Sequence, residues 1–140
     1  MKKLSTIALL LAIVVFVPVV YARSTVPVME RENVSVVTGS GKPVNNEALK
    51  RAIVSGGAAG ARKWEVVPAP DGQSLRGTYK VRNHTVVVNI VPGPASYSVK
   101  YADSINMKYD VENGSPVIHP FYNKWVDELI DSIQVELKKF

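Results

Sequence analysis

The chain has 140 residues, of which 46% are hydrophobic and 21% are charged, with 9 glycines, 9 prolines and no cysteine. These values fit one small globular domain and exclude a disordered or collagen-like chain. The formal net charge of +5 is too mild for the dense basic surface of a nucleic-acid-binding protein. The absence of cysteine excludes a disulfide framework, a thiolate nucleophile and a lipid-acceptor residue.

The first residues have the pattern of a secretory signal peptide. Two lysines precede the unbroken apolar run Ile7–Phe16, and Val20-Tyr21-Ala22 suits a signal peptidase. We therefore predict a signal peptide over residues 1–22, cleaved after Ala22, and a periplasmic or secreted protein without a stable membrane span after cleavage. An uncleaved anchor is the alternative, because the whole apolar stretch is about as long as the shortest membrane span.

Residues 23–32 contain Pro27 and little periodicity, so we predict a flexible leader there, followed by a single α+β domain over residues 33–140. A short strand is expected over Asn33–Thr38, and glycines and a proline close it. A helix should begin at Asn45 or Asn46, whose side chain can cap the first turn, and it should end near Gly56-Gly57.

From Trp64 onward the hydrophobic period changes to two, which is typical of strands. We predict strands over residues 63–67, 75–82, 85–91 and 96–109, the last of them kinked near Ala102-Asp103-Ser104. Asn83-His84 is expected to form a two-residue hairpin turn, and Pro92-Gly93-Pro94 breaks the chain between two strands. Such short connections imply an antiparallel meander.

The last part of the chain predicts an amphipathic helix that begins near Pro120. Its apolar residues step by three or four positions and form one stripe: Tyr122, Trp125, Val126, Leu129, Ile130, Ile133, Leu137 and Phe140. The predicted strands also alternate apolar and polar residues, so one face of their sheet should be buried. The expected fold class is α+β, a two-layer sandwich with two helices on one face of an antiparallel sheet of four to five strands.

No sequence motif identifies a reaction. The segment Gly39-Ser40-Gly41-Lys42 is only half of a phosphate-binding loop, and His84 and His119 lack the paired spacing of metal ligands. We therefore predict no metal, no cofactor and no catalytic residue. A small hydrolase-like enzyme that uses His119 with Ser104 or Asp103 is the alternative.

The polar face of the predicted sheet is the candidate binding surface. Side chains of Arg76, Lys80, Arg82, Lys100 and Lys108 would project together there and attract an anionic polymer of the cell envelope. The alternative is a solvated face whose cations only discourage aggregation through the sheet edges.

Two segments, Tyr97–Tyr109 and Ile118–Val126, carry a recognisable pattern. They resemble a group of small uncharacterised secreted and lipoprotein-like proteins of Gram-negative bacteria, in which Y-S-I-x-Y-x-x-S-x-N-x-x-Y precedes I-H-P-x-Y-N-x-W-V. The resemblance implies export and fold, and it implies no activity. Membrane anchoring does not carry over, because no cysteine follows the signal sequence here.

The matching polar residues of this pattern are either a binding-site signature or a helix-capping signature. Together, the cationic sheet face and this pattern give the following candidate binding residues: Lys80, Arg82, Lys100, Lys108, Tyr101, Ser104, His119 and Asn123. We expect a non-enzymatic, envelope-associated binding or structural domain whose partner is an anionic envelope polymer or another envelope protein, and not a nucleic acid. A subunit of an envelope complex, with the tyrosine-rich strand as an exposed edge, is a further alternative.

Overall fold

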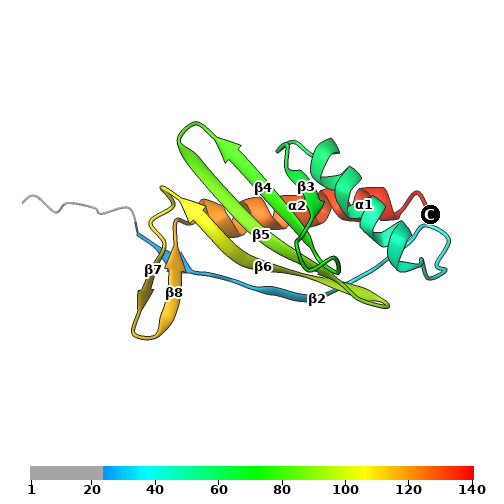
Figure 1. Ribbon diagram of the computed structural model, residues 1–140, viewed down its shortest axis with the longest axis horizontal. Helices are drawn as coiled ribbons and strands as arrows, with labels where there is room; N and C mark the ends of the chain where they lie inside the picture. The colour runs from blue at the N-terminus through cyan, green and yellow to red at the C-terminus, as the bar shows by residue number, and fades with distance from the viewer. Residues whose placement is uncertain (1–23) are drawn as a thin grey trace, which may run out of the picture.

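A computed structural model describes residues 24–140 (Figure 1). The expected signal peptide, residues 1–22, and its cleavage position lie outside the described residues. In chain order the elements are β1 (Val26–Pro27), β2 (Arg31–Ser35), α1 (Asn46–Ala59), β3 (Glu65–Pro68), β4 (Leu75–Val81), β5 (His84–Pro92), β6 (Ser96–Ile105), β7 (Asp110–Glu112), β8 (Ser115–Ile118) and α2 (Phe121–Leu137).

The larger sheet is antiparallel, with strand order β2-β6-β5-β4-β3. Its centre is the predicted meander, since β3 to β6 follow one another through short connections. The turn between β4 and β5 is Arg82-Asn83 instead of the expected Asn83-His84, because Val81 pairs with His84. Arg82 adopts a left-handed φ of 55° in this turn, so its side chain leaves the alternation of the strand.

Strand β6 contains the irregularity that its sequence predicted. Ala102 is the extra residue of a β-bulge, since its neighbours Tyr101 and Asp103 pair with consecutive residues of β5. As a result, Tyr101 and Ser104 both pair with β5 residues that are fully buried. The bulge therefore places these two polar-tipped side chains on the face of the sheet that packs against the core.

Both helices pack on one face of the large sheet, which confirms the predicted two-layer α+β fold. Figure 1 shows α2 running behind the strands. Helix α2 buries the predicted stripe through Tyr122, Trp125, Val126, Leu129, Ile133 and Leu137. Burial of each large apolar side chain contributes about 1.5–3 kcal/mol, so this helix is a dominant source of stability.

Helix α1 begins and packs as its sequence predicts. The Asn45 side chain accepts a hydrogen bond of 2.8 Å from the Ala48 amide and so caps the first turn. Gly56 is buried where α1 meets α2, and a Cβ atom at this position would lie 2.6 Å from the Ile133 Cα atom. The glycine therefore sets how closely the two helices approach each other.

A second sheet, with strand order β1-β8-β7, was not predicted. Strand β6 ends at Ile105 instead of reaching Tyr109, and the chain then turns into the β7–β8 hairpin. Asn113 and Gly114 form the hairpin turn with left-handed φ angles of 51° and 78°. An Asn-Gly pair is a strong hairpin signal, so this hairpin was detectable in the sequence.

Residues 24–32 are ordered by distant contacts, so the expected flexible leader is wrong for this segment. Strand β1 pairs with β8, and the Met29 amide donates a hydrogen bond of 3.0 Å to the Asn123 side chain. Arg31 forms a bidentate contact with Asp127, in which its Nε and Nη2 atoms donate to the two carboxylate oxygens at 2.7 and 2.9 Å. Strand β2 accordingly begins at Arg31 and not at Asn33. Local periodicity misses such a segment because all these partners lie in the last part of the chain.

Candidate functional site

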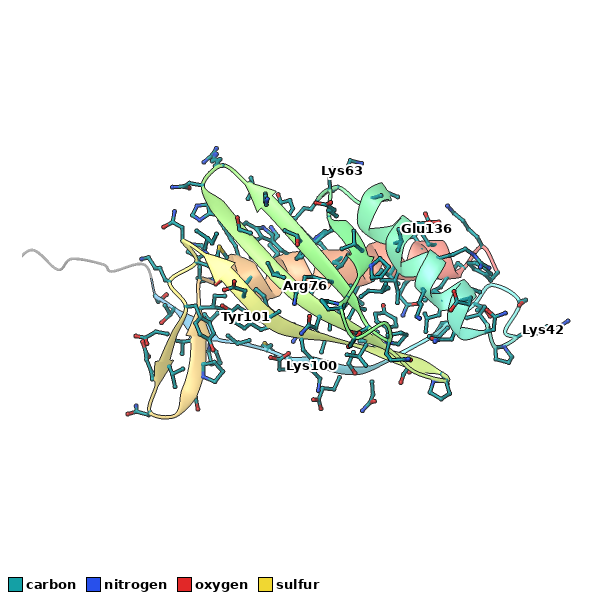
Figure 2. The ribbon with its side chains drawn as sticks, viewed as in Figure 1. Lys42, Lys63, Arg76, Lys100, Tyr101 and Glu136 are labelled. Carbon is teal, nitrogen blue, oxygen red and sulfur yellow. The ribbon has the colours of Figure 1, made fainter. Side chains whose placement is uncertain are left out.

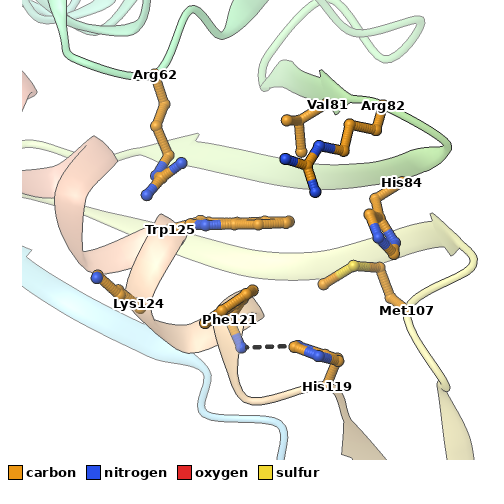
Figure 3. A pocket seen from close by; sticks show the side chains of 9 residues that line it. All are labelled: Arg62, Val81, Arg82, His84, Met107, His119, Phe121, Lys124 and Trp125. Carbon is orange, nitrogen blue, oxygen red and sulfur yellow. Dashed lines mark hydrogen bonds between the residues drawn. The ribbon is translucent and has the colours of Figure 1, made fainter.

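The main candidate site is a pocket of about 310 Å³ between the β4–β5 turn and the first turns of α2. We call it the cation–aromatic pocket, and its lining residues are Arg62, Val81, Arg82, His84, Met107, His119, Phe121, Lys124 and Trp125. In Figure 3, the Arg62 guanidinium lies over the Trp125 ring, the Arg82 guanidinium lies on the same side of the pocket, and Phe121 and His119 lie below the ring. The pocket thus combines an apolar floor with positive charge.

Arg62 is held in place by an acidic partner and two aromatic rings. Its guanidinium carbon lies 5.4 Å from the centre of the Trp125 ring and 5.7 Å from that of Tyr79. Its Nε–H donates to Glu128, and this hydrogen bond raises the pKa of Arg62 above its usual value. Since Glu128 also lies 3.9 Å from Lys124, one carboxylate offsets part of the charge of two cations.

Arg82 differs from Arg62 in having no acidic partner. Within residues 24–140 it forms no hydrogen bond and no ion pair, and its side chain is exposed. The left-handed conformation at the β4–β5 turn aims it toward α2. Arg82 is therefore a cation at the mouth of the pocket whose five donors are available to a ligand.

The two histidines of the pocket have defined tautomers when neutral. The Nδ1 atom of His84 lies 2.8 Å from the Asn106 carbonyl oxygen, which can only accept, so Nδ1 carries the proton. The Nδ1 atom of His119 accepts a hydrogen bond of 3.1 Å from the Phe121 amide, so its proton lies on Nε2 (Figure 3). His119 thereby satisfies one of the free amides at the start of α2.

The lining of the pocket is cationic and aromatic. Of the described residues that line it, none carries a carboxylate, a hydroxyl or a thiol. The pocket therefore presents positive charge and aromatic surface, and its titratable groups are arginines, a lysine and two histidines. An anion that also has an apolar part would fit both properties.

A second hollow, of about 490 Å³, adjoins the end of β6, and we call it the tyrosine hollow. Its lining residues are Tyr101, Ala102, Asp103, Ser104, Asn106, Met107, Lys108 and Tyr109. Ser104 Oγ lies 2.8 Å from the Tyr101 hydroxyl, and the Ser104 amide donates to Asp103. Partial burial raises the pKa of the Tyr101 hydroxyl.

The candidate residues of the hydrolase alternative are divided between these two sites. His119 lines the cation–aromatic pocket, whereas Asp103 and Ser104 line the tyrosine hollow. The Ser104 hydroxyl is bonded to a tyrosine and not to a histidine. Met107, which is 2% exposed, lines both sites.

The open face of the large sheet carries only part of the expected cationic surface. Arg76 and Lys100 flank Asn89 in one row of the sheet, and both are exposed there (Figure 2). Lys80 lies on the same face, but Lys100 pairs with Glu32 at 3.1 Å. Register also places the acidic residues Glu65 and Asp103 on this face, so its charge is mixed.

Three other candidate residues lie away from the open face. Arg82 and Lys108 have left-handed φ angles outside the strands and line the cation–aromatic pocket and the tyrosine hollow, respectively. Asn123 binds the backbone of the β1 segment through both ends of its amide, at the Pro27 carbonyl and the Met29 amide. Asn123 is therefore a structural clamp and not a cap of α2.

Of the residues that line the pocket, sequence reasoning named only Arg82 and His119 as binding candidates, and it missed Arg62, Lys124 and Phe121 in particular. Arg62 follows a glycine-rich stretch, and its contacts with Tyr79, Trp125 and Glu128, all distant in sequence, place it at the site. Phe121 is 52% exposed and lies off the apolar stripe of α2. A large apolar residue outside the buried face of a helix is the one signal that could have indicated it.

Two further searches of the described residues are negative. No group of three or more His, Cys, Asp and Glu side chains in residues 24–140 is placed to hold a metal ion. Neither helix of this part of the chain is long and apolar enough to cross a membrane. Comparisons with family models, with curated proteins and with solved structures find no match to this chain, so its function must be inferred from the geometry of its own sites.

Proposed function

We propose that this protein is an exported, non-enzymatic binding domain of the cell envelope, and that its cation–aromatic pocket takes an anionic ligand with an apolar ring or chain. One observation carries the proposal: Arg82 lines the same pocket as Trp125 and has no acidic partner among residues 24–140. Export rests on the signal-like pattern of residues 1–22.

Positive charge supports the anionic part of the ligand. Arg62, Arg82 and Lys124 all line the pocket, and Glu128 balances only part of their charge. A hydrogen bond to a charged group contributes about 1.5–3 kcal/mol, and the exposure of Arg82 places its contribution at the lower end. A bidentate contact with a phosphate or carboxylate suits the planar guanidinium group.

Aromatic surface supports the apolar part of the ligand. Phe121 lies 5.7 Å from Trp125 between ring centres and leaves about half of its surface open to solvent. A ring or chain placed on these side chains would bury apolar area, at about 25 cal/mol per Å². The open sheet face has a weaker case, because its cations alternate with Glu32, Glu65 and Asp103.

Calorimetric titration with naphthyl phosphate tests this proposal, with naphthol as the uncharged counterpart. Naphthyl phosphate should bind the full protein more tightly than naphthol does. The Arg82→Gln substitution should lower the affinity for naphthyl phosphate about tenfold, which corresponds to about 1.4 kcal/mol. It should leave the affinity for naphthol unchanged.

Arg76→Gln is the matched control, because Arg76 is an exposed arginine of the same β4–β5 hairpin but lies on the open face of the sheet, away from the pocket. Its affinity for naphthyl phosphate should equal that of the parent protein. Equal binding of the charged and uncharged compounds, or equal losses in the two arginine variants, would contradict the proposal.

A further inference from the structure

The tyrosine hollow contains a stacked aromatic pair that the fold of the large sheet does not require. Tyr101 and Tyr109 lie parallel, with an interplanar angle of 4° and 4.4 Å between ring centres. Tyr109 comes after the end of β6 and remains 42% exposed. The pair therefore presents an aromatic surface next to solvent.

Buried contacts hold this aromatic surface in one orientation. The Tyr101 ring meets Tyr122 edge-on, at 5.6 Å and 70°, and Tyr122 is completely buried in the core. The Tyr101 hydroxyl is fixed by Ser104 at 2.8 Å. Because Tyr101 is already fixed, little conformational freedom is lost when a ligand stacks on Tyr109, the exposed ring beside it.

Polar side chains surround the tyrosine pair. The Asn106 carbonyl is bonded to His84, but the Asn106 side-chain amide has no hydrogen-bond partner within residues 24–140. Asp103 is exposed, and within residues 24–140 only one of its carboxylate oxygens accepts a hydrogen bond, from the Ser104 amide. These groups offer both donors and acceptors at the edge of the ring surface.

We propose that the tyrosine hollow is a saccharide-binding site in which a sugar ring packs on Tyr109 and its hydroxyl groups bond to Asn106 and Asp103. A pyranose with equatorial hydroxyls has apolar C–H faces, which pack on an aromatic ring, and a polar rim. The hollow offers both parts, because the tyrosine pair forms a flat apolar surface and the lining also includes Asn106 and, from the open-face side of β6, Asp103. Its shape is open, so it suits one unit of a chain and not an enclosed small molecule.

This site is separate from the one in the proposed function. The cation–aromatic pocket selects for charge through arginines, whereas the tyrosine hollow selects for a ring with hydroxyl groups. Only Met107 lines both. Either site can therefore be removed by substitution without changing the residues of the other.

Saturation-transfer NMR with cellotriose tests the proposal, because this trisaccharide has equatorial hydroxyls throughout. Sorbitol is the control compound, since it carries similar hydroxyl groups but no ring. We expect transfer to the C–H protons of cellotriose and none to sorbitol. Absence of transfer to cellotriose, or equal transfer to both compounds, would overturn the proposal.

Three variants locate the binding. Tyr109→Leu should lower the affinity for cellotriose about five- to tenfold, because the stacking surface is lost. Tyr109→Phe should retain the affinity, because the ring remains. Phe121→Leu, which removes an exposed ring from the cation–aromatic pocket, should have no effect on cellotriose. Retained binding in Tyr109→Leu, or lost binding in Phe121→Leu, would reject the site. Circular dichroism of Tyr109→Leu reports whether the protein is folded, and this readout does not depend on whether the cation–aromatic pocket binds naphthyl phosphate.

Discussion

A single added methyl group at the crossing of the two helices should destabilise the protein, although helix propensity alone predicts the opposite. Gly56→Ala favours the helical state of α1 by about 1 kcal/mol. Its new Cβ atom would lie 2.6 Å from Ile133 Cα and 2.8 Å from Ile133 N. Ordinary contact begins at 3.4 Å, so α1 and α2 must separate by about 0.8 Å.

The steric cost exceeds the gain in propensity because the opposing atoms are backbone and cannot rotate away. Overpacking of a closely packed core costs about 1–3 kcal/mol, and a distance of 2.6 Å to a backbone atom places this case in the upper part of that range, at about 2–3 kcal/mol. After the gain in helix propensity of about 1 kcal/mol is subtracted, the net loss in free energy of unfolding is about 1–2 kcal/mol. With a urea m-value of about 2 kcal/mol per M, the unfolding midpoint should fall by about 0.5–1 M. The assay is urea unfolding followed by circular dichroism.

Ser55→Ala is the control for this prediction, since Ser55 is the preceding residue of α1 and is exposed. It should raise the midpoint slightly, because alanine is the better helix former. If Gly56→Ala also raised the midpoint, at an unchanged m-value, the inferred close contact between the helices would be refuted.

Three further predictions concern the N-terminal clamp, a turn and the core. Asn123→Ala removes both side-chain hydrogen bonds to the β1 segment, so stability should fall by about 1 kcal/mol and hydrogen exchange of the Met29 amide should accelerate; unchanged exchange would contradict the clamp. Hydrogen bonds from Ser74 lower the pKa of Asp71 from its ordinary value of 3.8. The ionised carboxylate therefore stabilises the fold above about pH 4, and this contribution is lost on acidification. The difference in melting temperature between the parent protein and Asp71→Ala should shrink below about pH 4, and a difference that stays constant would contradict this prediction. Leu129→Ala, at a side chain that is 1% exposed, should cost about 3 kcal/mol in urea unfolding, whereas the exposed Val135→Ala should cost well under 1 kcal/mol; similar losses would contradict the packing of α2.

The parts of the fold that local patterns specify were predictable. The stripe of α2 has one clear period, and its buried residues are those that the period selects. The cap at Asn45 and the bulge at Ala102 were also indicated by residues within a few positions. The β7–β8 hairpin was missed, because its strands are short and three of their seven residues are polar, although the Asn-Gly turn was visible.

The candidate sites were harder to predict, because they depend on where strands end. Arg82 and Lys108 alternate correctly with their neighbours in sequence, yet both lie just outside a strand and have left-handed φ angles. A shift of one residue at the end of β4 and of four residues at the end of β6 therefore moved two cations from the open sheet face into two different sites. The resemblance of residues 97–126 to secreted bacterial proteins stays a prediction.

The partners of β1 and β2 constrain the order in which the protein can assemble. Arg31 and Asp127 are 96 positions apart, and the Ser35 carbonyl accepts a hydrogen bond from Gln134, which is 99 positions away. A nascent polypeptide therefore exposes β1 and β2 unpaired until β8 and β6 have been synthesised, and their contacts with α2 become available last. Contacts of such long range form slowly.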